Sequence, residues 1–581
     1  MLRIFGLYSF SKYNSKTVEK FKEAFEVPSR FTKFKEFKWE NVYLNYESIN
    51  SKEADNFCFI APNKKLACFI TGNIYAYEEN TLEILPRKNL AQIILNKYKE
   101  KNIDFIKYLR GIFNIIIIDE HCLFLINDNL GLSPMYTCKT EDGLLFCNQA
   151  EPIIWSNNKN HVDYSSIAEF MFYGFVPDGK TFFRGLRNQE PSTIINVNKQ
   201  KISEKKYSSF RPTELKGLKH KQKVQLVKDT FGEAIKIRLN ENNIFSELSG
   251  GWDTRFVLAN LLELNTNVIP FTARRAEEDF IIAKKITKSK KLDHIILNST
   301  IIPSSLKNEY TFKFKPRKTI YDDTHRADAF NKDIECLKGM KFFTSPRFTG
   351  LFGTEFFGYV PYSIIRSVDQ NLNVVSHRLF LRDFLFKAYD TTEKKGLTNL
   401  KDISNSKSPT LLFLNQILRS YMHSHYAKSW EIPYASTWER PTYLFSYLSI
   451  KPFADSKFVS LLSSLDYDKC MYYKIYEEVY RKYYPEFMEI PWTFMRRRAQ
   501  NNLKKKISAE KTSEASKQQR LLKVLFKNEE FRKFLKRNKI IQKTNFAIGA
   551  RLRELYFIFN WFEAYKSILS DSETESLINI N

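Results

Sequence analysis

The stretch from Ile244 to Arg255 constrains the fold of this 581-residue chain more than any other part of it. Ile244, Phe245 and Leu248 predict a short strand, and the apolar spacing after Arg255 predicts a helix. Between them lie two consecutive glycines, which let the backbone turn tightly with its N–H groups pointing inward. Because the start of a helix adds partial positive charge, a turn of this kind is suited to binding phosphate.

The side chains of this turn favour the same interpretation. Ser249 and Thr254 supply hydroxyl donors. Gly250 and Gly251 leave the backbone open, and Asp253 supplies a carboxylate suited to Mg²⁺. A serine and two glycines alone are more often a simple turn between a strand and a helix. The strand, the aspartate and the helix together favour a phosphate site, so we interpret the turn as one.

The turn resembles the Ser-Gly-Gly-x-Asp-Ser pyrophosphate loop of the ATP pyrophosphatases, with Thr254 as its last residue. Those enzymes cleave ATP between its α and β phosphates and leave AMP on an acyl or similar oxygen. Val268–Thr272 predicts the next strand, Glu278–Asp279 the acidic start of a helix, and His294–Leu297 a third strand. This order is similar to the synthetase domain of the asparagine synthetases. The resemblance implies ATP and Mg²⁺ as ligands and places Thr272 beside the nucleotide.

A second motif, GLFGTEFFGY at Gly350–Tyr359, resembles the family's Gly-x-Gly-x-Asp-Glu-x-Phe-Gly-Gly-Tyr. The resemblance places Gly350 and Gly353 at the nucleotide. It also implies that Glu355 and Asp253 hold Mg²⁺ and act in the catalytic step.

Other positions depart from the family. Thr354 replaces an Asp, and Leu351 stands where a Glu near the incoming amine is expected. The family's late Lys has no clean match after Ile490-Pro491. Arg496, the first of three consecutive arginines, is the candidate for this catalytic cation, although Arg and Lys differ in geometry. Lys474 matches a helical Lys at the nucleotide end of the family, with a solvated lysine on a helix face as the alternative.

The N-terminal part of the chain resembles the amidohydrolase-type domain of the same family. Residues 103–155 contain a Gly-x-Phe strand, an Asp-x-x-Gly-x-x-Pro turn and a further strand, and residues 173–198 fit the connecting segment. The matching positions, in order, are Gly72, Ile74, Tyr75, Gly111, Phe113, Asp119, Asp128, Gly131, Pro134, Tyr136, Pro177, Thr181, Gly185, Pro191 and the Pro-Phe-x-Asp at Pro452–Asp455. The resemblance spans about residues 1–495.

The resemblance implies a mixed fold, α/β plus α+β. An Ntn-hydrolase-like αββα sandwich at residues 1–205 is followed by a polar, Lys-rich linker at 206–222. Residues 223–500 are expected to form a PP-loop domain like the adenine nucleotide α hydrolases, with a parallel sheet and a helical C-terminal part. Residues 501–581 indicate a basic helical extension, and their aromatic spacing favours a docking face.

Glutamine hydrolysis by the N-terminal domain is not expected. Glutamine-using members begin with a Cys whose thiolate attacks the amide while the terminal amine acts as base. This sequence begins Met1-Leu2, and its first cysteine is Cys58. Asn73 also replaces the family's Glu, and Thr71 stands in place of an Asn. We expect the domain to serve as a scaffold or to grip a substrate.

Composition sets further bounds. The net charge is +26, but the Lys excess is spread along the chain without a helix-turn-helix, zinc-finger or RNP-type pattern, so a nucleic-acid partner is not expected. The seven cysteines form no C-x-x-C pair, Cys122 and Cys147 lie in strand-like runs, and no His cluster indicates zinc. The apolar runs are too short to span a membrane and Met1–Phe10 lacks a signal-peptide pattern, so we expect a cytoplasmic protein.

Together with the resemblance, these residues predict an ATP-dependent ligase. Such an enzyme adenylates a carboxylate, releases pyrophosphate and transfers the acyl group to an amine. Relatives without the N-terminal Cys include the β-lactam synthetases and the lasso-peptide cyclases, so the expected acid is a small molecule or a peptide, and the amine donor is open. Ammonia-dependent asparagine synthesis and an inactive nucleotide- or partner-binding relative stay open as alternatives, as does a homodimer.

Overall fold

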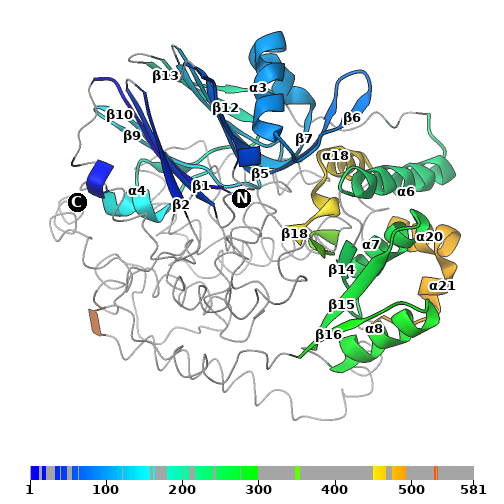
Figure 1. The fold of residues 1–581 in the computed structure, drawn as a ribbon. Helices are drawn as coiled ribbons and strands as arrows, with labels where there is room; N and C mark the ends of the chain where they lie inside the picture. Colours follow the sequence, from blue (N-terminus) through cyan, green and yellow to red (C-terminus); the bar gives the residue numbers. More distant parts are fainter. Residues whose placement is uncertain are drawn as a thin grey trace, which may run out of the picture.

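Figure 1 shows the computed structural model, in which antiparallel sheets from the N-terminal part of the chain accompany a smaller parallel sheet. The structure describes residues 2–11, 16, 18–20, 33–39, 41–48, 55–62, 65–120, 122–148, 150–156, 161–163, 166, 179–198, 201–208, 215, 217–239, 244–274, 277–298, 347–353, 449–465, 474–492, 529–530 and 533.

Two antiparallel sheets form the N-terminal part. The first has the strand order β11-β9-β10-β1-β3-β2. Its strands are β1 (Leu2–Ser9), β2 (Lys33–Trp39), β3 (Val42–Ser48), β9 (Tyr136–Thr140), β10 (Gly143–Cys147) and β11 (Leu186–Asn188). The second has the order β13-β12-β8-β7-β5-β4, with β6 paired to β5. Its strands are β4 (Cys58–Ile60), β5 (Ala67–Glu78), β6 (Leu82–Ile84), β7 (Leu109–Asp119), β8 (Cys122–Asn127), β12 (Thr193–Asn198) and β13 (Lys201–Lys206).

Helices cover the outer faces of these sheets. Helix α3 (Leu90–Lys101), followed by the 3-10 helix η1 (Asn102–Tyr108), packs on the second sheet, and the short α4 (Glu151–Ser156) packs on β9 and β10 (Figure 1). Both sheets and α3 share one apolar core. The run 115–118 in β7 is fully buried, as expected for a strand covered on both faces. The predicted antiparallel sandwich is therefore confirmed.

The turn after β8 is held by one buried carboxylate. Asp128 accepts the backbone N–H groups of Leu130 at 2.9 Å and Ser133 at 3.0 Å. Gly131 has a φ of 60°, and a Cβ at this position would lie 3.1 Å from the Cα of Pro191. The predicted Asp-x-x-Gly-x-x-Pro turn thus depends on the carboxylate for its hydrogen bonds and on the glycine for its space.

The smaller sheet is parallel, with the order β16-β15-β14-β17-β18. Its strands are β14 (Ile244–Glu247), β15 (Val268–Arg274), β16 (Ile295–Asn298), β17 (Arg347–Phe348) and β18 (Ser449–Ile450). The helices that share its core are α6 (His220–Lys236), α7 (Trp252–Glu263), α8 (Glu277–Ser289), α18 (Ser456–Ser464), α20 (Lys474–Tyr483) and α21 (Pro485–Met488), together with the 3-10 helix η4 (Pro452–Ala454). The parallel sheet and the three strands predicted in this part are confirmed.

The predicted domain limits stay predictions. Strand β13 ends at Lys206, and α6 already begins at His220, inside the segment 206–222 that the sequence assigns to a linker. The extension 501–581 lies almost wholly outside the described residues. Cys122 and Cys147 are free thiols in strands; Cys147 is buried, as expected for both, whereas Cys122 is only half-buried. In the part of the chain that the structure describes, no helix has both the length and the apolar character needed to cross a membrane.

Asp128 generates a prediction about pH. Burial raises the pKa of Asp128 to about 6, although its backbone hydrogen bonds act in the opposite direction. The folded state therefore binds this proton more tightly than the unfolded chain does, and the stability so gained is lost as the pH rises through the folded pKa. We expect the free energy of unfolding of the wild type, relative to Asp128→Asn, to be about 1 kcal/mol larger at pH 5 than at pH 7. Urea denaturation of both proteins measures this difference, and a relative stability that rises with pH would contradict it.

Candidate nucleotide-binding site

The candidate site lies at the carboxyl ends of two adjacent parallel strands. Strand β14 ends at Glu247 and pairs with β17, which ends at Phe348. Residues 249–254 follow the first strand, and residues 349–353 follow the second. Because parallel strands end at the same edge of a sheet, the two segments that the sequence assigns to the nucleotide meet there.

Hydrogen bonds within the turn fix its shape. The Ser249 N–H donates to Thr254 Oγ1 at 3.0 Å, and the hydroxyl oxygens of these two residues lie 3.1 Å apart. The Gly251 N–H donates to Ser249 Oγ at 3.1 Å. Both predicted hydroxyls therefore brace the turn, and helix α7 begins directly behind it at Trp252.

Gly350 and Gly353 pack directly against this turn. A Cβ on Gly350 would lie 2.7 Å from the backbone N of Thr254, and a Cβ on Gly353 would lie 2.4 Å from Cγ of Asp253. Any side chain at Gly353 would therefore displace the carboxylate that the sequence assigns to Mg²⁺. The two glycines are required by close approach of the chain rather than by a positive φ.

Thr272 lies under the turn and is buried. Its hydroxyl donates to the Leu248 carbonyl at 2.7 Å, and His294 Nε2 lies 2.8 Å from the same oxygen. Since the hydroxyl proton is already used, His294 donates through Nε2, and its Nδ1 faces Thr287 Oγ1 at 3.3 Å. Burial, followed by the charge of Lys284, lowers the pKa of His294 and favours the neutral ring. These contacts hold the end of β14 in place.

Arg255 ties the turn to a distant segment of the chain. The side chain is fully buried and donates to four backbone carbonyls, those of Gly250, Phe487, Ile490 and Pro491, at 3.2, 3.0, 2.6 and 2.9 Å, respectively. A guanidinium presents five N–H donors in a planar fork, which suits several acceptors at once. Burial lowers the pKa of Arg255 to about 10, so the group stays charged at neutral pH.

Aromatic side chains also connect the turn at 249–254 to the segment around Trp492. Trp252 stacks on Trp492 with ring centroids 4.5 Å apart. The Trp252 carbonyl accepts the hydroxyl of Tyr480 at 2.6 Å. Tyr480 belongs to α20, whose first residue is the predicted Lys474. Lys474 therefore begins a helix that is anchored to the turn, and its own side chain is exposed.

The structure brings the predicted nucleotide-binding residues to one edge of the parallel sheet. These residues are Ser249, Gly250, Gly251, Asp253, Thr254, Thr272, Gly350 and Gly353. Glu355 and Arg496 lie outside the described residues, as does Thr354. The roles predicted for all of these residues and for Lys474 stay predictions.

Sequence reasoning missed the residues that hold this corner together: Arg255, Tyr480 and Trp492. One signal for Arg255 was available, because α7 is buried nearly all round and a charged residue in such a helix needs partners. The spacing of Tyr476 and Tyr480 indicates one buried helix face. Neither pattern identifies the segment that these side chains meet.

The chemistry of the turn fits the phosphates of ATP. Gly250 and Gly251 place the backbone at the start of a helix, and the missing side chains of Gly350 and Gly353 keep the second segment close to it. Such a cradle suits anionic oxygens. The Asp253 carboxylate next to the cradle is an oxygen ligand of the kind that Mg²⁺ prefers.

Thr71 and Asn73 are the positions at which the N-terminal domain departs from the family pattern for glutamine, and both contact side chains of the same domain. Thr71 Oγ1 accepts a hydrogen bond from Asn114 Nδ2 at 3.1 Å, and Asn73 Oδ1 accepts one from Arg87 at 3.0 Å. Burial raises the pKa of Cys58 to about 11, so this thiol is protonated at neutral pH. Within the described residues, these side chains serve contacts inside the domain.

The contacts of Arg255 give a prediction about stability. We expect Arg255→Met to lower the free energy of unfolding by about 3 kcal/mol, because buried carbonyls lose their donor. Urea denaturation followed by tryptophan fluorescence, to which Trp252 and Trp492 contribute, measures this loss. As a control, Arg481→Met removes an exposed arginine of α20 that pairs with Glu477, and we expect a change of about 0.5 kcal/mol or less. If the two variants lost equal amounts of unfolding free energy, the hydrogen bonds of Arg255 would not have the stabilising role inferred for them.

Comparisons with known proteins find sequence similarity over parts of this chain. Residues 46–208 match the family model of a glutamine amidotransferase domain. Over 253 residues, or 41% of this chain, the sequence is 22% identical to the glutamine-hydrolyzing asparagine synthetase 1 of Bacillus subtilis (strain 168). Over 210 residues, or 32% of the chain, it is 25% identical to asparagine synthetase 3 of the same organism. The matched parts span 39% and 32% of those relatives' own lengths.

Similarity to solved structures is weak. The glutamine phosphoribosylpyrophosphate amidotransferase of B. subtilis, complexed with ADP and GMP, gives a TM-score of 0.25 at 10% identity, covering 54% of this chain and 71% of that one. This likeness is too low to identify a fold. The sequence matches are more specific: residues 46–208 are similar to a glutamine amidotransferase domain, and the chain is distantly similar to an asparagine synthetase over 41% of its length.

Proposed function

We propose that this protein is an ATP-dependent, amide-forming ligase. It adenylates a substrate carboxylate on a small molecule or peptide, releases pyrophosphate and passes the acyl group to an amine. The proposal is carried by one observation, the packing of Gly350 and Gly353 onto Asp253 and Thr254 at the carboxyl edge of a parallel sheet. The distant likeness to asparagine synthetases supports it.

The proposed chemistry uses the donors of this edge. The carboxylate of the acid attacks the α-phosphorus, the bond to the bridging oxygen breaks, and pyrophosphate leaves. Backbone N–H groups and the start of α7 lower the free energy of the negative charge that grows on the leaving oxygens. An amine then attacks the activated carbonyl, which gives the amide and AMP.

Several side chains have proposed roles in this reaction. Asp253 would hold Mg²⁺ together with Glu355, and the ion would neutralise part of the phosphate charge. Lys474 and Arg496 are the proposed cations for the transferring group. Thr272 supports the turn from below through the Leu248 carbonyl.

We further propose that the N-terminal domain does not hydrolyse glutamine. Thr71 and Asn73 differ from the family at the glutamine positions, and both are engaged by neighbouring side chains. The raised pKa of Cys58 also makes this thiol a poor nucleophile at neutral pH. The amine is then free ammonia or an amine carried by a substrate.

Two alternatives have specific support. The likeness to asparagine synthetases favours aspartate as the acid and ammonia as the amine. Leu351, at the position of the family's Glu, favours an inactive relative that binds nucleotide without turnover, as does Thr354. The experiment below separates these alternatives from the main proposal.

We expect the wild-type protein to release pyrophosphate from ATP with Mg²⁺ when the correct carboxylic acid is supplied from a panel. Asp253→Asn should lower this rate by about 100-fold, because it removes a charged ligand at the phosphates. Gly353→Ala should have a similar effect, since its Cβ would displace the Asp253 carboxylate. A coupled pyrophosphate assay measures the rates.

Gly232→Ala is the matched control for the glycine variant. Gly232 lies inside α6, where the nearest atom to an added Cβ is 3.7 Å away. We expect full pyrophosphate release and a gain in stability of about 1 kcal/mol. Release that needs both aspartate and ammonia would establish the asparagine alternative. Binding of ATP without release for any acid would establish the inactive relative, and unchanged release in Asp253→Asn would overturn the proposed site.

The proposed loss of glutamine hydrolysis is tested separately. We expect no glutamate to form from glutamine above the uncatalysed rate, with or without ATP and an acid, because the described thiols with raised pKa are protonated at neutral pH. Chromatographic detection of glutamate measures the outcome. Steady formation of glutamate that scales with protein concentration would contradict this part of the proposal.

A further inference from the structure

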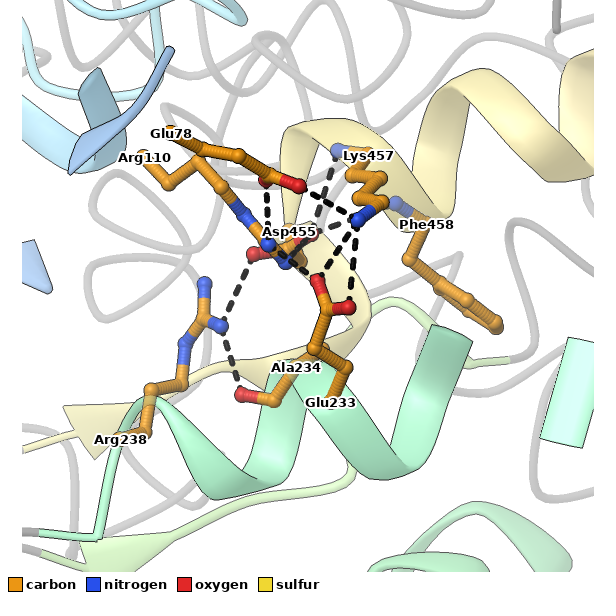
Figure 2. Close-up of polar contacts among 8 residues, drawn as sticks. All are labelled: Glu78, Arg110, Glu233, Ala234, Arg238, Asp455, Lys457 and Phe458. Carbon is orange, nitrogen blue, oxygen red and sulfur yellow. Dashed lines mark hydrogen bonds and ion pairs between the residues drawn. The ribbon is translucent and has the colours of Figure 1, made fainter. Parts of the chain in front are cut away.

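A network of six charged side chains joins the N-terminal domain to the part of the chain that carries the candidate site (Figure 2). The N-terminal domain contributes Glu78 at the end of β5 and Arg110 in β7. The other part contributes Glu233 in α6, Arg238 just after α6, and Asp455 and Lys457 at the start of α18.

Asp455 lies at the centre of this network and is fully buried. Its Oδ1 accepts from Arg110 Nη2 at 2.8 Å, and its Oδ2 accepts from Arg238 Nη1 at 3.0 Å. The same carboxylate caps α18 by accepting the N–H groups of Lys457 and Phe458 at 3.1 and 3.3 Å. Burial alone would raise the pKa of Asp455, but the two guanidinium groups hold it below its ordinary value.

Arg110 bridges the two parts of the chain. Besides Asp455 it contacts Glu233, and it lies 2.8 Å from Glu78. Lys457 completes the network at 2.7 Å from Glu78 and 3.0 Å from Glu233. Three cations thus balance three carboxylates, and the loss of Arg110 would leave buried negative charge without its partner. Such a loss is costly in a protein interior.

A short series of contacts leads from this network to the nucleotide site. Asp455 follows η4, which itself follows strand β18. In β18 the Ile450 carbonyl accepts the backbone N–H of Thr349 at 3.0 Å. Thr349 directly precedes Gly350, which packs on Thr254 of the phosphate turn. Asp455 is therefore connected to the segment 350–353 through the five preceding residues of the chain and the pairing of β18 with β17.

A second route passes through the apolar core. Phe453, two residues before Asp455, is fully buried and packs on Phe256 with ring centroids 6.3 Å apart. Phe256 belongs to α7, the helix whose first turn forms part of the candidate site. Packed interiors transmit displacements because they contain little free volume. Both routes start from the carboxylate that Arg110 holds.

We propose that Arg110 is a positioning residue for the nucleotide site. By binding Asp455 it fixes residues 449–455, and through them it holds the segment 350–353 against Asp253. The N-terminal domain would then be needed for the geometry of the ligase site. The part of this inference that concerns ATP rests on the proposed function. The part that concerns the position of residues 350–353 does not.

Hydrogen exchange of the protein without nucleotide tests the structural part. We expect Arg110→Met to speed amide exchange in peptides covering 249–254 and 347–353 by about tenfold. Exchange in β8, inside the sandwich core, should stay as in the wild type. Equal exchange of both site peptides in the two proteins would overturn the inference, whether or not the protein binds ATP.

Calorimetry with ATP and Mg²⁺ tests the functional part through a double-mutant cycle of Arg110→Met and Asp455→Asn. Asparagine keeps the helix cap of α18, so this variant removes mainly the charge. We expect each single variant to weaken ATP binding by about tenfold and the double variant to weaken it no further than either one. Arg110→Lys should restore part of the affinity, because it keeps the charge. Additive effects without rescue would overturn the positioning role.

Lys97→Met is the matched control. Lys97 pairs with Glu83 at 2.7 Å inside the N-terminal domain and lies over the ring of Tyr77. We expect this variant to change neither the exchange of the site peptides nor the ATP affinity. If Arg110→Met fails to fold, Lys457→Met removes a half-exposed member of the same network and should give a smaller change in the same direction. If the wild type binds no ATP, the proposed function fails, and the exchange experiment still decides the inference.

Discussion

Two glycines allow the segments after β14 and β17 to pack together: Gly350 lies against the backbone of Thr254, and Gly353 lies against the side chain of Asp253. As a result, two separate motifs form one edge. With any larger residue at Gly353, the carboxylate assigned to Mg²⁺ would have to move. The shape of the candidate phosphate turn therefore depends on the small size of Gly350 and Gly353 as well as on its own residues.

Two buried arginines join segments that are distant in the sequence, and they do so in different ways. Arg255 donates to backbone carbonyls, so its four acceptors carry only partial charge. Arg110 donates to carboxylates, which raise its pKa against the effect of burial. The first holds the loop before the predicted Arg496 close to the turn. The second connects the sandwich to Glu233 and Asp455. Each guanidinium satisfies several acceptors at once, which a lysine cannot do in one plane.

The N-terminal part resembles a glutamine amidotransferase domain over residues 46–208, and Thr71 and Asn73, which differ there from the family pattern, both contact neighbouring side chains. Asp128 still closes the turn after β8, and the two sheets share a continuous core. Thr71 accepts a hydrogen bond from Asn114, and Asn73 accepts one from Arg87. Through Arg110, the domain contacts Asp455 in the part of the chain that carries the candidate site.

Features that depend only on neighbouring residues could be predicted without the structure. The strand–turn–helix at 244–255 and the strands β15 and β16 follow from local spacing and glycine, whereas the Asp128 turn was predicted from the family resemblance. Tertiary structure decided which distant segments meet: Arg255 with Pro491, and Arg110 with Asp455, 345 residues further along the chain. Every residue has a carbonyl group, so the acceptors of a buried arginine leave no mark in a sequence. Ion pairs between domains are equally hard to predict, because a charged residue in a helix or strand is usually exposed to solvent.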